Sequence, residues 1–326
     1  MKCTFILALL ILFSHSSLAS TLKIATLSPD GTAWMKLMRE GAREVEDATS
    51  GRVKIKFYPG GVMGSDSAVM RKIRLRQLHG AALPTGALYD AAPNLRLYNV
   101  PALFQSFDEV DTVRKTLDPI MLSELELGGF VSLGFAEGGF AYLMSKKPIS
   151  NLNEIQQRKV WVPEGDDYIL DVVRNFGVMP IPLGIADVLA ALQTGMIDTV
   201  SSSPTGAIAL QWHTQVSHMM DFPILYFLGT LVIDSKAFSK LKQEDQLVVK
   251  RIMRAKFADI DMANRRDNLS AYLAMQKMGV KLHKLAPEEA ANWRMRAEQL
   301  SSMLTEQEQV SIDLYVKIKQ LLNAPQ

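Results

Sequence analysis

The sequence predicts an α/β protein, and three observations support that fold class. LKIATL (22–27) is a hydrophobic strand, and apolar residues then recur at helical spacing between Ala33 and Ala48. VKIKF (53–57) alternates as a second strand, and the order strand, helix, strand is typical of a βαβ unit with parallel strands. The 326 residues, of which 48% are hydrophobic, suffice for one large or two medium domains with real cores.

The alternation of strands and helices continues along the chain. YPGGVMGSD (58–66) predicts a loop, and Asp66 or Ser67 is expected to cap a helix over 68–79. Gly195 is expected to close a later helix as a C-terminal glycine. Further strands are predicted at FVSLGFAE and FAYLMS (130–145), KVWV (159–162) and MIDTVSSS (196–203), and further helices at 166–176 and 186–195.

One long segment, Lys236 to Met278, contains neither Gly nor Pro. Val249, Met253 and Phe257 keep helical spacing within it. Since helices in globular proteins usually run to about 11–12 residues, the segment predicts an unusually long helix, straight or bent, that braces two lobes. The remainder of the chain to Asn323 is also predicted to be mostly helical.

The N-terminus has the pattern of a secretory signal peptide over residues 1–19. Lys2 precedes an apolar run at 5–13, and SLA (17–19) supplies the small residues of a cleavage site. The run is too short to span a bilayer, and no later stretch is long and apolar enough. Cleavage would remove Cys3, the only cysteine, so the exported protein would depend on its core without disulfides. We therefore expect a periplasmic protein.

No motif in the sequence indicates a catalytic, cofactor or metal site. Gly-x-Ser-x-Gly elbows, phosphate-binding Gly-rich loops, dinucleotide fingerprints and His-Glu-x-x-His helices are all missing. His213 and His218 lack the spacing of a helical face, and only Asp221 lies beside them. Ser201 to Ser203 form a strand end whose hydroxyls can hydrogen-bond, with no motif that supplies a base. The formal net charge of +2 gives no electrostatic footprint for nucleic acid. We predict a protein that is no enzyme, with no cofactor and no nucleic-acid partner.

Several landmarks, in their order and spacing, resemble the extracytoplasmic solute-binding proteins of TRAP transporters, of the DctP type. They are LKIAT with SPDGTAW, SGRVKIKFYPGG with MGSD, VPALF, SKKPI with KVWVPEG, and VMPIPLGIADVLAALQTGMIDTV. The resemblance implies two α/β lobes around a cleft, hinged by crossover segments and a long helix. It also implies that the lobes close over a small ligand, which is then handed to a TRAP-type membrane permease.

The resemblance further implies where the lobes begin and end. By analogy, the first lobe comprises 20–138 and 227–266, and the second comprises 139–226 and 267–326. The segment free of Gly and Pro fits the long helix that the family uses across both lobes.

The family's anion clamp is missing from the matching positions. The family pattern Lys-hydrophobic-Arg-Val-Pro has Trp161 in place of its Arg, and GF (139–140) is followed by Ala141 where a second Arg is common. Ser201 and Ser202 replace frequent Glu and Asn ligands. Because a hydrogen bond to Arg contributes about 1.5–3 kcal/mol, a carboxylate bound in the usual way would lose most of its affinity. The ligand is therefore predicted to be apolar, aromatic or amphipathic.

The candidate site combines aromatic and small side chains around the indole at the family's ligand position. That indole offers a broad apolar face and one N–H donor, although it could instead pack the hinge as core. The candidate ligand-binding residues are Trp161, Phe140, Ala141, Tyr142, Glu164, Ser202, Trp212, Thr85 and Leu27.

Other interpretations stay open at this point. The indole could stack on a cationic ligand, with Glu164, Asp166 and Asp167 as counter-charges. Lys159, with Arg158 nearby, could restore an anion clamp for an organic acid. The protein could also shuttle a lipid or another hydrophobe with a partner other than a permease. A periplasmic enzyme on a recycled binding-protein fold has no motif in its support.

Overall fold

The computed structural model describes residues 19–323. Residues 1–18, nearly all of the predicted signal peptide, lie outside the described residues, as do 324–326. Among the described helices, none combines the length and the hydrophobicity that crossing a bilayer requires.

Ten strands of the described chain form one hydrogen-bonded sheet. Its order is β2-β1-β3-β9-β4-β7-β5-β6, while β8 pairs with β4 and β10. β1 and β2 pair in parallel, which confirms the predicted βαβ unit. The strands are β1 (Ser20–Thr26), β2 (Val53–Tyr58), β3 (Gly80–Pro84), β4 (Phe130–Ser145), β5 (Val160–Pro163), β6 (Pro180–Leu183), β7 (Thr199–Ser202), β8 (His218–Met220), β9 (Leu225–Asp234) and β10 (Lys281–His283).

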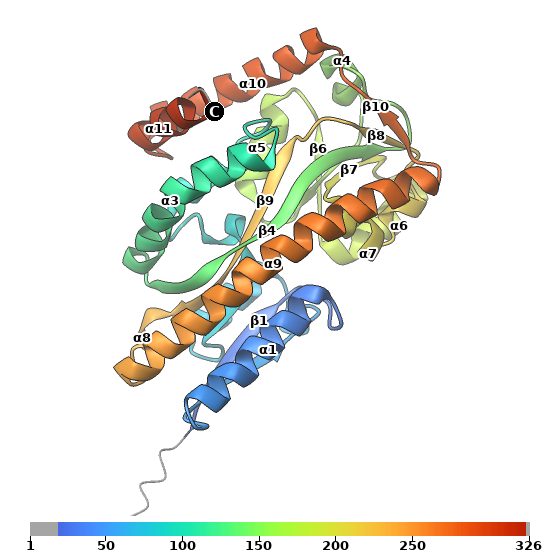
Figure 1. The fold of residues 1–326 in the computed structure, drawn as a ribbon. Coiled ribbons are helices and arrows are strands. Elements are labelled where there is room, and N and C mark those ends of the chain that lie inside the picture. Colours follow the sequence, from blue (N-terminus) through green and yellow to red (C-terminus); the bar gives the residue numbers. More distant parts are fainter. Residues whose placement is uncertain (1–18, 324–326) are drawn as a thin grey trace, which may run out of the picture.

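Helices cover both faces of this sheet (Figure 1). They are α1 (Ala33–Ala48), α2 (Asp66–Arg74), α3 (Phe107–Leu127), α4 (Leu152–Gln156), α5 (Asp167–Asn175), α6 (Val188–Thr194), α7 (Pro204–Ala209), α8 (Ser235–Phe238), α9 (Gln243–Lys277), α10 (Pro287–Glu306) and α11 (Ile312–Asn323). Short 3-10 turns are η1 (Thr85–Leu88), η2 (Pro93–Asn99), η3 (Ile185–Asp187) and η4 (Trp212–Thr214).

The start of α2 differs from the prediction. Ser65 caps the helix, because its Oγ accepts a hydrogen bond from the Ala68 N–H at 3.4 Å. The predicted caps were Asp66 and Ser67, which instead lie inside the first turn. The carboxylate of Asp66 is therefore not needed for capping.

The two strands predicted between residues 130 and 145 are one continuous strand, β4, that crosses from lobe to lobe. It pairs first with β9 and then with β7, with a register shift between Glu137 and Gly139. Gly139 has a φ of 87°, and a Cβ there would lie 2.5 Å from the Asn268 Nδ2 atom. Only glycine fits this bend without strain.

Helix α9 confirms the predicted long helix. It runs for 35 residues without a break and follows β4 across the molecule (Figure 1). Its buried face includes Val249 and Phe257 in the first half and Ala271 and Met275 in the second. Because both lobes pack on one helix, α9 ties them together.

The hydrophobic core also joins the lobes. One cluster of buried side chains includes Leu88 and Leu95 before β4, together with Tyr168 and Phe176 from α5. The structure thus has the two lobes packed against each other, which is a closed arrangement.

Candidate functional site

Trp161 and Trp212 pack together in the second lobe. Their ring centroids are 5.0 Å apart, and they are 8% and 2% exposed. The Trp161 Nε1–H donates to the Leu183 carbonyl at 3.0 Å. The indole therefore uses its face and its donor within its own lobe, and its contact with a ligand stays a prediction.

The three candidate residues on β4 are divided between two neighbourhoods. Phe140 packs against Tyr226 with ring centroids 5.7 Å apart. Tyr142 lies 5.7 Å from the ring of Tyr272 on α9. Ala141 is completely buried. Tyr142 packs against the hydrophobic cluster that contains Trp161 and Trp212, whereas Phe140 belongs to a different cluster.

Of the serines at the end of β7, Ser202 and Ser203 form local hydrogen bonds, whereas the buried Ser201 Oγ has no partner among the described residues. The Ser202 Oγ–H donates to the Ser203 carbonyl at 3.0 Å, and Ser203 caps α7 by accepting from the Gly206 N–H at 3.3 Å. Tyr142 pairs with Ser202 across the sheet. Glu164 is exposed just after β5. This arrangement suits a hydrogen-bonding strand end and involves no nucleophile.

The two cations considered for a relocated clamp lie at the start of β5. Arg158 donates to the Pro148 carbonyl at 2.9 Å, and Lys159 donates to the Gly195 carbonyl at 3.1 Å. Ligands in α/β sheets bind outside the carboxyl ends of the strands, so these cations are at the wrong end of β5.

Leu27 and Thr85 both lie in the first lobe, among side chains of that lobe. Leu27 lines a narrow crevice with Met63, Asp66 and Leu83, and the crevice leaves no room for a water molecule. The buried Thr85 Oγ1 accepts a hydrogen bond from the Asn99 side chain.

An aromatic pair extends this contact across the lobes. Tyr89 of the first lobe and Tyr168 of α5 meet edge to face, with ring centroids 5.3 Å apart. Asn99 donates to the Tyr89 hydroxyl at 2.8 Å, while the Tyr168 hydroxyl donates to the Asn99 carbonyl at 3.4 Å. The Arg96 guanidinium lies 4.7 Å from the centre of the Tyr89 ring.

Asp66 brings a carboxylate to this contact without a partner. Its Oδ1 atom is buried and accepts no hydrogen bond from the described residues. Burial raises the pKa of Asp66 to about 6, and the negative charge of Asp166 contributes to the rise.

Asp166 faces the first lobe from the start of α5. Its Oδ1 caps the helix by accepting from the Ile169 N–H at 3.0 Å. Its Oδ2 lies so close to Gly86 that a Cβ on that glycine would be 2.9 Å away. Burial raises the pKa of Asp166, and the charge of Arg96 opposes that rise.

Sequence reasoning found only part of this interlobe surface. Thr85, Leu27 and Asp166 were among the predicted residues, but Asp66 was assigned to a helix cap. Tyr89 and Tyr168 had no signal beyond their apolar surroundings. The only local sequence feature that could have indicated a functional role for Asp66 is its position directly after a glycine-rich loop.

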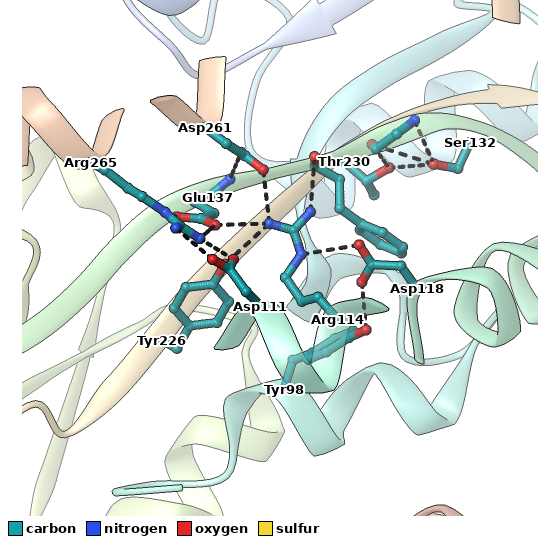
Figure 2. Close-up of polar contacts among 12 residues, drawn as sticks. Tyr98, Asp111, Arg114, Asp118, Ser132, Glu137, Tyr226, Thr230, Asp261 and Arg265 are labelled. Atoms are coloured by element: carbon teal, nitrogen blue, oxygen red, sulfur yellow. Dashed lines mark hydrogen bonds and ion pairs between the residues drawn. The ribbon is translucent and has the colours of Figure 1, made fainter. Parts of the chain in front are cut away.

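A second group of charges lies at the hinge (Figure 2). The Glu137 carboxylate is wholly buried, and each arginine of the group reaches it, Arg114 at 3.0 Å and Arg265 at 2.5 Å. The Arg114 guanidinium also lies 3.0 Å from Asp118 and 2.8 Å from Asp261. The group, which we call the hinge network, consists of Arg114, Arg265, Asp111, Asp118, Glu137 and Asp261.

The hinge network adjoins the three predicted crossings between the lobes. Glu137, Tyr226 and Arg265 are next to the boundaries at 138/139, 226/227 and 266/267. Beyond them, Asn268 donates to the Gly138 carbonyl at 3.1 Å. The network therefore joins α3, β4 and α9 where the chain passes between lobes.

A groove of about 490 Å³ opens over the hinge network between α3 and α9. It is larger than the crevice beside Leu27, but apart from Lys115 the charged side chains that line it are paired with one another. Burial raises the pKa of Asp261 to about 6, and the charge of Arg114 opposes the rise. We therefore assign the candidate ligand site to the interlobe surface, where the charges have no such partners.

The fold and the interlobe surface define a two-lobed α/β binding protein. Its family follows from a family model, DctP, described as bacterial extracellular solute-binding protein, family 7, which matches residues 24–308. The chain belongs to this family, whose members are extracytoplasmic solute-binding proteins of TRAP transporters. It is accordingly a binding protein and not an enzyme, as the sequence predicted.

Curated relatives are distant. The chain is 22% identical to YiiZ of Salmonella typhimurium over 223 residues, 65% of this chain and 66% of the relative. A solute-binding protein of Verminephrobacter eiseniae is 24% identical over 63% of this chain and 62% of its own length. The alignments therefore span slightly less than two thirds of these two relatives. The C4-dicarboxylate-binding periplasmic protein DctP of Rhodobacter capsulatus is 24% identical over 76% of this chain and 75% of its own.

Solved structures of TRAP solute-binding proteins have the same fold. One from Pseudomonas putida F1, with bound D-glucuronate, has a TM-score of 0.82 at 19% identity and covers 92% of this chain and 96% of its own. DctP7 of Bordetella pertussis, which binds pyroglutamic acid, has a TM-score of 0.84 at 19% identity, over 94% of this chain and 100% of its own. At this identity, the likeness establishes the fold alone.

Proposed function

We propose that this protein is a periplasmic receptor that captures a small ligand by lobe closure and delivers it to TRAP-type permease subunits. Membership of the family supports the role, and the names of relatives such as the sialic acid-binding periplasmic protein of Vibrio cholerae point to small polar solutes. Export through a cleaved signal peptide over residues 1–19 is part of the proposal.

The observation that carries the proposal is the contact between the lobes. The Tyr168 hydroxyl donates to the Asn99 carbonyl, and Asp166 lies against Gly86, so side chains of the second lobe contact the first lobe directly. A ligand that contacts both lobes favours the closed state by the difference between its affinities for the two states.

We propose an amphipathic ligand, since the site has aromatic and charged walls and no arginine at Ala141 or Trp161. Tyr89 and Tyr168 would contact its apolar body. Whether Trp161 contacts the ligand, as the sequence predicted, is tested by its fluorescence in a variant whose other three tryptophans are Phe.

A second candidate is an organic-acid receptor with a relocated cation. Arg96 favours it, because its guanidinium lies beside the interlobe tyrosines and its charge reaches Asp166. The solved neighbours include proteins with bound D-glucuronate and succinate. Arg96 would then grip the acid in place of the two missing arginines.

Closure can be tested on the full exported chain, purified without refolding. Native mass spectrometry identifies co-purified compounds, and a thermal-shift screen of acids, amines and neutral solutes extends the search. A bound ligand is expected to reduce the radius of gyration in small-angle scattering. Binding without compaction, or no binding by any compound, would contradict the proposal.

Gly86→Ala gives a matched test of closure, because its new methyl group would meet Asp166 only when the lobes are together. We expect a loss of about 1 kcal/mol, roughly fivefold in affinity, for any ligand. Gly184→Ala is the control, since a Cβ there would meet Asp187 of its own lobe at an ordinary 3.4 Å. Equal affinities in the two variants would argue against lobe closure.

A further inference from the structure

We propose that helix α11 is a strap that returns the chain from the second lobe to the first and resists the opening of the lobes. The proposal rests on the proposed function, because it concerns the movement by which the receptor captures its ligand. The boundaries expected from the family resemblance place all of 267–326 in the second lobe. The contacts of α11 favour the first lobe instead, so the segment after α10 would be a fourth connection between the lobes.

Helix α11 is held on α3 of the first lobe. Among the described elements it packs mainly against α3 and otherwise against its neighbour α10 (Figure 1). Its fully buried Ile318 belongs to the same hydrophobic cluster as Leu117 and Met121 on the buried face of α3. Just before α11, the Ser311 N–H donates to the Asn94 Oδ1 at 2.6 Å. Partly buried apolar side chains of α11 pack on the same cluster: Leu314, Tyr315, Leu321 and Leu322. Apolar burial and a hydrogen bond thus fix α11 to the first lobe.

Helix α10, by contrast, is held on the second lobe. The ring centroid of Trp293 lies 5.4 Å from that of Phe176, which directly follows α5. Towards the other end of α10, the Asn175 side-chain amide donates to the Met303 Sδ atom at 3.3 Å. The helix also packs against α4. We therefore expect α10 to follow α4 and α5 when the lobes move.

The chain between the two helices is short. Residues 307–311 join α10 to α11, and Glu308 has a left-handed φ of 55° there. At 3.3–3.6 Å per residue, this linker spans at most about 18 Å when fully extended. The ion pair between Lys319 of α11 and Glu298 of α10, at 3.1 Å, has both side chains exposed and contributes little. The two helices can therefore change their angle at the linker but cannot move far apart.

The strap contacts α3 at a distance from the hinge. Arg114 belongs to the hinge network, whereas the Asn94 N–H donates to the Glu124 carboxylate at 3.2 Å. Glu124 lies about 15 Å further along α3, at 1.5 Å per residue. A rotation of the first lobe about the hinge therefore displaces this end of α3 relative to α10. Since opening has to strain the linker or pull α11 from α3, the strap favours the closed state.

Spin-label distances test which lobe α11 follows, because cleavage of the predicted signal peptide would leave an exported chain without cysteine. Labels are attached in pairs at three exposed positions through Lys36→Cys on α1, Asp171→Cys on α5 and Lys317→Cys on α11. Distances are measured by pulsed electron paramagnetic resonance in the full exported chain and in Gly86→Ala, which is expected to disfavour closure. The distance between positions 36 and 171 should lengthen in Gly86→Ala. The distance between 171 and 317 should change with it, and the distance between 36 and 317 should stay constant.

A second set of variants tests whether the strap resists opening. Ile318→Ala removes the buried contact of α11 and should raise the open population, seen between positions 36 and 171, about tenfold. Val316→Ala, on the same helix and 46% exposed, is the control and should match wild type. Ile318→Asp, which places a charge at the buried position, is the stronger variant of the two. An α11 that stays on α3 in both Ile318 variants, or that leaves α3 without a gain in the open population, would overturn the proposal.

The outcomes separate the strap from the proposed function. If Gly86→Ala opens the lobes while α11 keeps its distance to position 171 and moves away from position 36, α11 belongs to the second lobe. That result would overturn the strap and leave lobe closure intact. Distances that are identical in the wild type, Gly86→Ala and both Ile318 variants would mean that the lobes do not move, which would overturn both.

Discussion

The hinge network and a second pair of acidic residues, Asp66 and Asp166, both contain carboxylates that are at least partly buried. The hinge carboxylates form ion pairs with arginines, whereas Asp66 and Asp166 form none among the described residues. At the hinge, Glu137 is reached by two arginines, and Asp261 lies 2.8 Å from one of them. Away from the hinge, Asp66 and Asp166 form no ion pair among the described residues, and the buried Asp66 Oδ1 accepts no hydrogen bond. Burial raises the pKa of Asp261 and of Asp66 to the same value, about 6.

The difference between the two groups lies in their partners and not in their burial. A buried charge with a partner on a neighbouring element stabilises the packing of that element, because removing either partner leaves the other charge buried and uncompensated. A buried charge without a partner destabilises the closed protein until something binds it. The paired carboxylates therefore stabilise the hinge, whereas the unpaired Asp66 is destabilising as long as it stays buried and charged.

The largest effect is expected at the hinge, from Arg114→Met. The change leaves Asp118 and Asp261 without their guanidinium, so the free energy of unfolding should fall by about 3–5 kcal/mol in urea denaturation. Lys115→Met, one residue on and exposed, should change it by less than about 0.5 kcal/mol. A loss below about 1 kcal/mol for Arg114→Met would remove the contrast between the two groups.

A smaller effect is expected from Trp161→Phe. The variant loses the hydrogen bond to Leu183 and part of the packing on Trp212, which should lower the free energy of unfolding by about 1–3 kcal/mol. Trp34→Phe is the control, because the buried Trp34 Nε1 has no partner among the described residues. Equal losses would mean that the Leu183 hydrogen bond contributes nothing. Ligand affinity, measured on both, decides whether Trp161 also lines the site.

The smallest effect, of opposite sign, is expected from Asp66→Asn, which should raise the free energy of unfolding by about 1–2 kcal/mol at pH 7. The pKa of Asp66 is about 6 in the folded protein, which is above the pKa of this carboxyl group in the unfolded chain. Wild type should therefore lose stability relative to the variant as the pH rises from about 4 to about 6. Asp261 is present in both proteins, so its contribution cancels.

Urea denaturation of both proteins at pH 4, 5, 6 and 7 checks this prediction. The curves should converge at low pH, where Asp66 is protonated in the folded and the unfolded state. Parallel curves across this range would show that Asp66 is not an unpaired buried carboxylate.

Much of the fold could be predicted from local pattern. The alternation in VKIKF, the C-terminal Gly195 and the segment without Gly or Pro each correspond to an element of the structure. The order of the family motifs predicted the family. The predicted N-cap of α2 was wrong, because Ser65, Asp66 and Ser67 are all residue types that cap helices well. The extended backbone conformation at Ser65, which only the structure shows, makes Ser65 the cap.

The sequence by itself determined the α/β class, the long helix and the family, since all of these are read from periodicity and from residue types in order. Only the tertiary structure decided which buried charges find partners. Arg114 meets Asp261 across a long stretch of chain, while the buried Oδ1 of Asp66 is left without a partner among the described residues. The energy of a charge depends on distance and burial, and neither is a local property of the sequence.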